Sequence, residues 1–142
     1  MNYELIMLKN AQRMKKNIKI LTKEMQLIAM RSYDTTNWKN GTLGQIDAIS
    51  ELSSEIEHLV SFCNSIEKAL LIIPSKYRAL LVAVYFKNYD KEQLGKRFGV
   101  SRSTVYRKLF VARKLFYEAL QSIGCTEEWF KALYCEKDSP LR

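Results

Sequence analysis

Apolar residues recur at steps of three and four along two long stretches of the chain. The first stretch runs from about Asn2 to Arg31 and contains Met7, Ala11, Met14, Ile18, Leu21, Met25 and Ile28. The second runs from about Leu43 to Ile73 and contains Ile49, Leu52, Ile56, Leu59, Cys63, Ile66, Leu70 and Ile73. This spacing places the apolar side chains on one helix face, as in a coiled coil. The pattern predicts two long amphipathic helices.

Turn-forming residues at 32–41 predict a chain reversal and an antiparallel helical hairpin. Thr42 and Gln45 have the spacing of a capping box at the start of the second helix. Residues 1–39 carry eight basic and three acidic side chains, whereas residues 40–73 carry one and five, so charge favours the pairing. The same periodicity also fits a coiled coil between two chains. Both arrangements stay open, and we expect a homo-oligomer formed through residues 1–73.

Pro74 marks the next boundary, because proline ends a helix or occupies the first turn of a new one. Residues 75–88 predict a helix whose apolar side chains cover the segment that follows: Tyr77, Leu80, Leu81, Val84 and Tyr85. The sequence from Asp90 to Lys114 is DKEQLGKRFGVSRSTVYRKLFVARK. It predicts two helices joined by a tight turn, which is the layout of a helix-turn-helix unit.

The first of these two helices has signals at both ends. Asp90 and Gln93 have the spacing of a capping box. Leu94 and Phe98 lie four residues apart, so both are expected to point into a core. Gly99 stands where a residue in the left-handed conformation ends the helix.

The second helix passes close to the first, and Gly95 is expected to be small enough to permit this. Ser101 is a suitable N-cap. The expected buried stripe consists of Val105, Leu109, Ala112 and Phe116.

The outer face of this second helix, the expected recognition helix at about 102–117, is polar and basic. Arginine can pair with the two acceptors of guanine, and hydroxyl groups reach bases or phosphates. The predicted base-reading set is Arg102, Ser103, Thr104, Arg107 and Lys108. Phosphate contacts, which position a protein without specifying sequence, are expected from Lys91, Lys96, Arg97 and Lys114. A basic face that only meets water is the plainer alternative, but it leaves the agreement of caps, glycines and stripes unexplained.

Charge supports a polyanionic partner. The net charge is +8, and residues 74–124 alone hold eleven basic and three acidic side chains. Residues 1–73 contribute +1 and residues 125–142 contribute −1. The surplus therefore lies in the helix-turn-helix segment, as expected for a DNA-binding protein.

Patterns typical of an enzyme are absent from the sequence. It contains no nucleophile elbow, phosphate-binding glycine loop or zinc-ligand spacing. Asp47, Glu51 and Glu55 recur four apart and are interpreted as a solvated acidic face. We expect no enzymatic activity, metal or cofactor. No apolar run is long enough to span a bilayer and no signal-peptide order is present, so we expect a cytoplasmic protein.

Residues 74–120 resemble the promoter-reading helix-turn-helix of bacterial sigma factors, known as region 4. The matching core, from Tyr89 to Leu109, reads YDKEQLGKRFGVSRSTVYRKL. Lys108 departs from the pattern, since many sigma-like units have an apolar residue there. The whole layout is most similar to phage and prophage late-gene regulators of the ArpU and RinA type. This resemblance implies a transcriptional activator that binds phage promoter DNA, and it alone implies that the cell is a bacterial host.

The sequence predicts an all-α protein, with a long N-terminal helical hairpin or coiled coil followed by a helix-turn-helix. The expected division is 1–73, 74–124 and 125–142, the last a short helix and tail. RNA polymerase is a possible further partner, through that helix or through a second stripe of Tyr106, Phe110, Arg113 and Tyr117. Two other functions stay open. One is a phage small terminase subunit, in which the DNA-binding unit usually precedes the oligomerisation helices, whereas here it follows them. The other is a helical adaptor whose basic face contacts an acidic protein.

Overall fold

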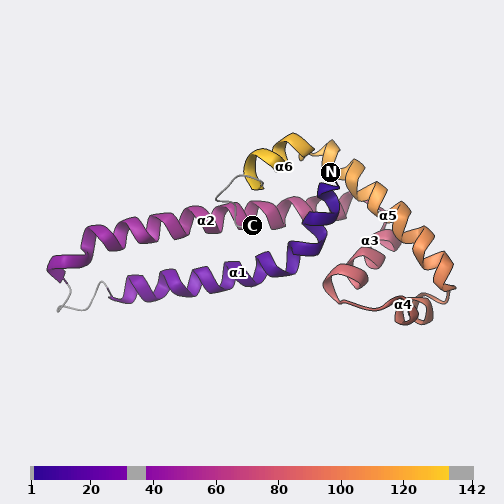
Figure 1. The fold of residues 1–142 in the computed structure, drawn as a ribbon, viewed down its shortest axis with the longest axis horizontal. Helices are drawn as coiled ribbons and strands as arrows, with labels where there is room; N and C mark the ends of the chain where they lie inside the picture. Colours follow the sequence, from indigo (N-terminus) through magenta and orange to yellow (C-terminus); the bar gives the residue numbers. More distant parts are fainter. Residues whose placement is uncertain (1, 32–37, 135–142) are drawn as a thin grey trace. The chain divides into compact units, whose positions relative to one another are not determined.

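The structure, a computed structural model, describes residues 2–31 and 38–134, and these form helices joined by short connections. Two long helices come first, α1 (Tyr3–Arg31) and α2 (Trp38–Ile72). The helices α3 (Ser75–Leu81), α4 (Lys91–Phe98), α5 (Arg102–Ser122) and α6 (Glu127–Tyr134) follow, with a π-helical turn, η2 (Val82–Phe86), after α3. The predicted all-α class is confirmed, and Figure 1 shows the order of the helices.

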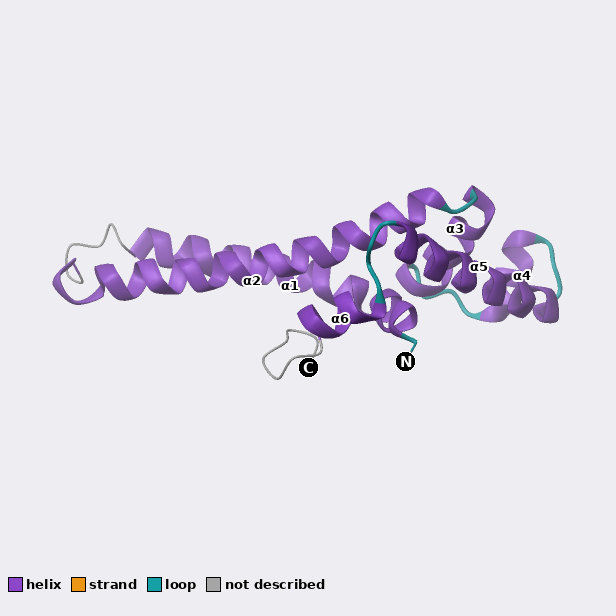
Figure 2. Cartoon of the chain, turned by 90° about the horizontal axis from the view of Figure 1, so that it is seen from above, coloured by secondary structure: helices purple, strands orange, loops and turns teal. Residues whose placement is uncertain are grey.

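Residues 13–63 form one compact unit, in which α1 and α2 run side by side in opposite directions (Figures 1 and 2). Met14, Leu59, Phe62 and Cys63 are buried there. Farther along the hairpin the predicted apolar stripes are only half-buried: Ile18, Leu21, Met25 and Ile28 on α1, and Ile49, Leu52 and Ile56 on α2. The heptad pattern therefore forms a helical hairpin within one chain.

The second helix begins earlier than its capping signals predicted. It starts at Trp38, so the predicted cap at Thr42 lies inside the helix. Gly44 is likewise helical, although an interior glycine costs roughly 1 kcal/mol relative to alanine. Residues 32–37 of the predicted turn lie outside the described residues.

Residues 1–12 and 64–142 form the other compact unit. Its core includes the N-terminal turns of α1, because Tyr3 is completely buried. The Tyr3 hydroxyl donates to the carbonyl oxygen of Cys125 at 2.6 Å and accepts from Gln121 Nε2 at 2.9 Å. Its ring contacts Tyr117 and Phe130, with centroids 5.8 and 5.6 Å away. The start of the chain is thus fixed between α5 and α6.

The predicted boundary at Pro74 is a break between two helices. Pro74 directly precedes α3, and its carbonyl oxygen accepts from the backbone N–H groups of Tyr77 and Arg78. The Arg78 guanidinium then donates to the carbonyl oxygens of Leu70, Leu71 and Ile73 at 2.7–3.2 Å. These are the carbonyls that the end of α2 leaves without helical partners.

The compact units do not follow the predicted division at residue 73, since the end of α2 and the start of α1 both belong with the helix-turn-helix segment. The C-terminal helix folds back on this unit through Phe130 and Tyr134, which are each 1% exposed. Residues 135–142 of the predicted tail lie outside the described residues. None of the described helices is both long and apolar enough to cross a membrane.

Candidate nucleic-acid interface

The helix α4 begins at the predicted capping box. The Asp90 carboxylate accepts from the backbone N–H of Gln93 at 2.8 Å, and the Gln93 side chain accepts from the backbone N–H of Asp90 at 3.1 Å. The helix ends at Gly99, which has φ 67° and ψ 31°. Glycine takes this left-handed conformation without the strain that a Cβ adds. Both ends of α4 are therefore fixed by the residues that the sequence indicated.

The turn between α4 and α5 explains Gly95 differently from the prediction. A Cβ on Gly95 would lie 2.9 Å from the backbone carbonyl oxygen of Val100, closer than real Cβ atoms come. The Val100 N–H donates to the Gly95 carbonyl oxygen at 3.0 Å. Gly95 thus allows the turn, rather than the second helix, to pass close to α4.

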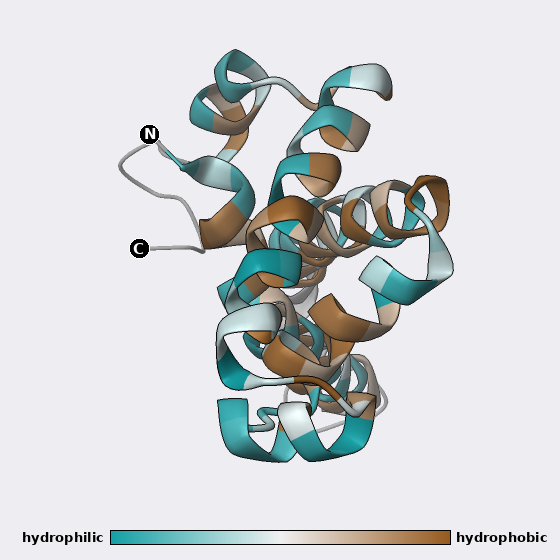
Figure 3. Ribbon diagram, turned by 90° about the vertical axis from the view of Figure 1, so that its right-hand side faces the viewer, coloured by the Kyte–Doolittle hydropathy of each residue, from teal (hydrophilic) through white to brown (hydrophobic). Residues whose placement is uncertain are grey.

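The helix α5 has its predicted cap and buried stripe. Ser101 Oγ accepts from the Thr104 N–H at 3.3 Å. The predicted stripe of Val105, Leu109, Ala112 and Phe116 is at most 2% exposed. The helix α5 packs on α3 and α4. Most residues of α4 are hydrophilic, as the colours of Figure 3 show. Ser103 and Arg107, on the side of α5 opposite this packing, are exposed in the described part of the chain.

Phe98 was predicted to be a core residue, and that prediction is wrong. Leu94 is completely buried, but Phe98 is 38% exposed. Phe98 lines a small pocket with Tyr77, Leu80 and Lys108. It is the last residue of α4, directly before the Gly99 cap.

The five predicted base-reading residues do not all face the same way. Arg107 and Ser103 are exposed and lie opposite the buried stripe. Arg107 forms no hydrogen bond or ion pair with any described residue. The hydroxyls of Ser103 and Thr104 lie 3.2 and 2.9 Å from Ser101 Oγ, so they take part in the helix cap. Lys108 is on a flank, against the pocket that Phe98 lines.

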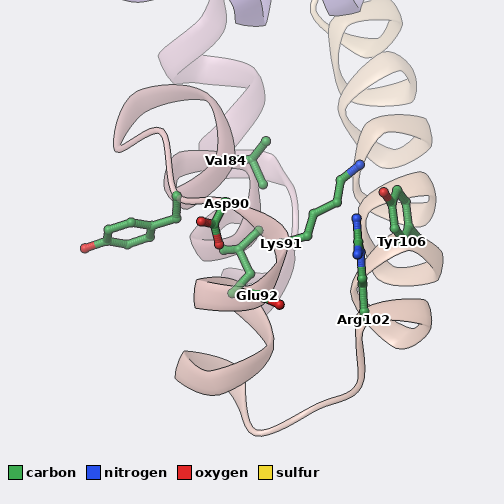
Figure 4. A pocket seen from close by; sticks show the side chains of 8 residues that line it. Val84, Asp90, Lys91, Glu92, Arg102 and Tyr106 are labelled. Atoms are coloured by element: carbon green, nitrogen blue, oxygen red, sulfur yellow. The ribbon is translucent and has the colours of Figure 1, made fainter.

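Arg102 instead joins Lys91, a predicted phosphate contact, at Tyr106. Lys91 Nζ lies 3.7 Å from the centroid of the Tyr106 ring, a cation–π contact. Figure 4 shows Lys91 from α4 and Arg102 from α5 both reaching towards this ring. Hydrogen bonds from Lys91 and then Arg102 lower the pKa of the Tyr106 phenol.

Lys91, Arg102 and Tyr106 form a cluster with two positive charges, and the carboxylates of Asp90 and Glu92 line the same open pocket. Within the described part of the chain, neither Lys91 nor Arg102 forms an ion pair with a carboxylate. Two cations are therefore held next to each other without an anion between them. Such an arrangement favours binding of an anion such as phosphate.

The other predicted phosphate contacts are exposed on α4 and α5. Arg97 Nη1 donates to the Tyr89 hydroxyl at 3.0 Å and its guanidinium lies 5.1 Å from the Tyr89 ring centroid. Lys96 projects from the same helix, and Lys114 is two turns beyond Arg107 on α5. Tyr106 was predicted to belong to the second stripe and was missed as a member of this surface. The spacing of Arg102 and Tyr106 at i and i+4 was the available signal.

Residues 73–122 match the model of a protein family described as the helix-turn-helix of DDE superfamily endonucleases. Searches of curated proteins and of solved structures gave no match. The matched segment covers α3, η2, α4 and α5, so it coincides with the capped helices and the basic face described above. This match supports the predicted helix-turn-helix DNA-binding motif, but it does not extend to sigma region 4 or to ArpU specifically. The chain carries a helix-turn-helix DNA-binding domain C-terminal to a helical hairpin.

Proposed function

We propose that the protein is a sequence-specific transcriptional regulator, an activator of phage or prophage late genes, that places α5 in the major groove of DNA. The observation that carries the proposal is the outer face of α5, where Arg107 is exposed and without a partner in the described residues. An α-helix fits the major groove, and arginine there pairs bidentately with guanine. Ser103, one turn earlier, is the second candidate for base contact.

The surrounding cations have a different role in this proposal. Lys91 and Arg102 hold a backbone phosphate at Tyr106, while Lys96, Arg97 and Lys114 contact neighbouring phosphates. Phosphate contacts fix the register of a protein on DNA but carry no sequence information. Arg102 was predicted to read a base, but in this proposal it contacts a phosphate, because its side chain is directed to Lys91 and Tyr106.

The proposal includes no catalytic role and no cofactor. Asp47, Glu51 and Glu55 are exposed on α2, which supports a solvated acidic face. Contact with RNA polymerase is assigned to Phe110, Arg113 and Tyr117 of the second stripe, since Tyr106 belongs to the phosphate cluster. Phe110 is 70% exposed, and it lines an open groove with Leu5, Arg113, Lys114 and Tyr117.

The family match favours a second candidate, recognition of a specific site for a DNA-cutting or DNA-packaging reaction. The matched family is named for endonucleases. A phage small terminase subunit, which binds the DNA site where packaging begins, belongs to this second kind of candidate. Both candidates require the same DNA-reading face, but they differ in where the recognised site lies. A regulator binds next to transcription starts, whereas a packaging or recombination protein binds at the positions that are cut.

An unbiased selection from random duplex DNA, at about 150 mM salt to suppress non-specific binding, tests the proposal. We expect one enriched motif, and we expect the Arg107→Ala protein to select the same motif with a relaxed preference at one base pair. Mapping of the motif in the host and phage genome then separates the two candidates. Binding that has no preferred sequence at any salt concentration would contradict both of them.

A further inference from the structure

The helix α1 has a second stripe, on the side nearly opposite its apolar stripe. It consists of Arg13, Lys16, Ile20, Lys23, Leu27 and Met30, which follow at steps of three and four. All six residues are exposed. A helix with two stripes at this spacing can pack on two neighbouring helices at once. Among the described residues of the hairpin unit, α2 is the neighbour that packs on the first stripe (Figure 2).

The apolar members of this stripe are unusually accessible. Ile20, Leu27 and Met30 are 61, 56 and 69% exposed. A lone exposed aliphatic side chain is ordinary, but three on one helix face mark a surface that another molecule covers. These six residues are called the outer stripe below.

Charge identifies the partner. Residues 13–31 of α1 contain six basic and one acidic side chain. The exposed surface of α2 is the reverse, with Asp47, Glu51, Glu55 and Glu57 and no Lys or Arg between residues 40 and 67. Ile46, 57% exposed, adds an apolar side chain next to this acidic surface. The outer stripe needs an acidic helix with small and apolar residues, and α2 of the same protein is such a helix.

We propose that the outer stripe of α1 binds the acidic surface of α2 in a second copy of the chain, so that the hairpins assemble into an oligomer. Burial of Ile20, Leu27 and Met30 supplies the driving force. The lysines and the carboxylates select α2 rather than α1 as the partner helix, because like charges oppose an α1–α1 contact. The inference does not depend on DNA binding, since none of these residues belongs to the helix-turn-helix.

Sedimentation velocity and light scattering of the full chain test the proposal. We expect an assembly of at least two 16.6 kDa chains at micromolar concentration. The double variant Ile20→Asp, Leu27→Asp is expected to be monomeric. Gln26→Asp, which changes an exposed residue of α1 outside the stripe, is the matched control and is expected to assemble as the wild type does. Circular dichroism verifies that each variant remains helical.

A charge exchange then identifies the contact itself. The variants Lys16→Glu, Lys23→Glu and Glu51→Lys, Glu55→Lys should each associate at least tenfold more weakly, and their mixture should recover assembly. Recovery requires that α1 of one chain meets α2 of another. A monomeric wild type, assembly of the double aspartate variant, or failure of the mixture would each overturn the proposal. Binding of the monomer to vesicles of anionic lipid would reassign the outer stripe to a membrane surface.

Discussion

At the scale of single residues, Tyr3 shows how strongly one side chain can tie distant parts of the sequence together. It is buried, and its hydroxyl has one acceptor at Cys125 and one donor at Gln121. Tyr3→Phe leaves both groups without this partner, so we expect a loss of about 1–3 kcal/mol in the free energy of unfolding. Urea denaturation at neutral pH measures the loss.

The same residue gives a dependence on pH. Burial raises the pKa of Tyr3 from 10.0 to about 12, so folding favours the protonated phenol. Its stabilising contribution is complete below pH 10 and is lost as the pH rises to about 12. The difference in stability between wild type and Tyr3→Phe should therefore shrink over this range. A difference that stays constant from pH 9 to 12 would show that the hydroxyl does not remain protonated.

Arg107 and Arg102 provide a matched pair on one helix. We expect Arg107→Ala to weaken binding to the selected motif by about 1–3 kcal/mol and to relax the preference at one base pair, because it removes a base contact. Arg102→Ala should weaken binding to all sequences equally and lower the salt slope by roughly one, because it removes a phosphate contact. Titration of the motif and of single-base variants by fluorescence anisotropy measures both. Uniform loss for Arg107→Ala would leave that residue a phosphate contact.

At the scale of elements, the turn between α4 and α5 is the least tolerant part of the helix-turn-helix. Gly95→Ala brings a Cβ to 2.9 Å from the Val100 carbonyl oxygen, a backbone atom that cannot rotate away. We expect a loss of about 1–3 kcal/mol, as for other overpacked sites. Thermal unfolding compares it with Gly44→Ala, which meets no atom within 4 Å inside α2. Alanine should stabilise that helix by roughly 0.5–1 kcal/mol. Equal effects at the two positions would mean that the turn can adjust.

The elements that the sequence predicted well are those with local signals. Asp90, Gln93, Gly99 and Ser101 act on backbone groups a few residues away, so their spacing determines their role. Phe98 was mispredicted because periodicity gives the face of a helix but not where the neighbouring helix ends. Other contacts join residues that no local pattern relates.

Two of these long-range contacts explain what the sequence could not predict. Tyr3 bonds a residue 122 positions away, and Lys91 meets Tyr106 only because α4 and α5 are packed together. The capping of the α2 C-terminus by Arg78 was not predicted either, because no local pattern relates its guanidinium to carbonyl groups on the other side of Pro74. The candidate site was therefore predicted as a set of residues, while the division into a base-reading residue and a phosphate cluster required the structure.

At the scale of the whole molecule, the two proposals together predict how the DNA site is arranged. An oligomer that assembles through its hairpins carries more than one α5, so the selected motif should occur as two copies. Binding of the second copy is then intramolecular, and the gain in affinity over a single copy can reach about 10²–10⁴. We expect this gain for the wild type and for Gln26→Asp. The monomeric variant Ile20→Asp, Leu27→Asp should bind one-copy and two-copy duplexes with equal affinity per site.

The comparison of wild type and double aspartate variant also shows which proposal fails, the recognition of DNA by α5 or the assembly through the hairpins. A protein that assembles but selects no motif would retain the hairpin contact and lose the regulatory function. A protein that reads a single motif with equal affinity in wild type and double aspartate variant would retain the recognition helix and lose the assembly. Anisotropy titrations with the one-copy and two-copy duplexes distinguish these cases. The salt concentration must be the same in all titrations, because affinity for DNA depends steeply on salt. The outer stripe of α1 and the free face of α5 are thereby tested in the same protein by independent substitutions.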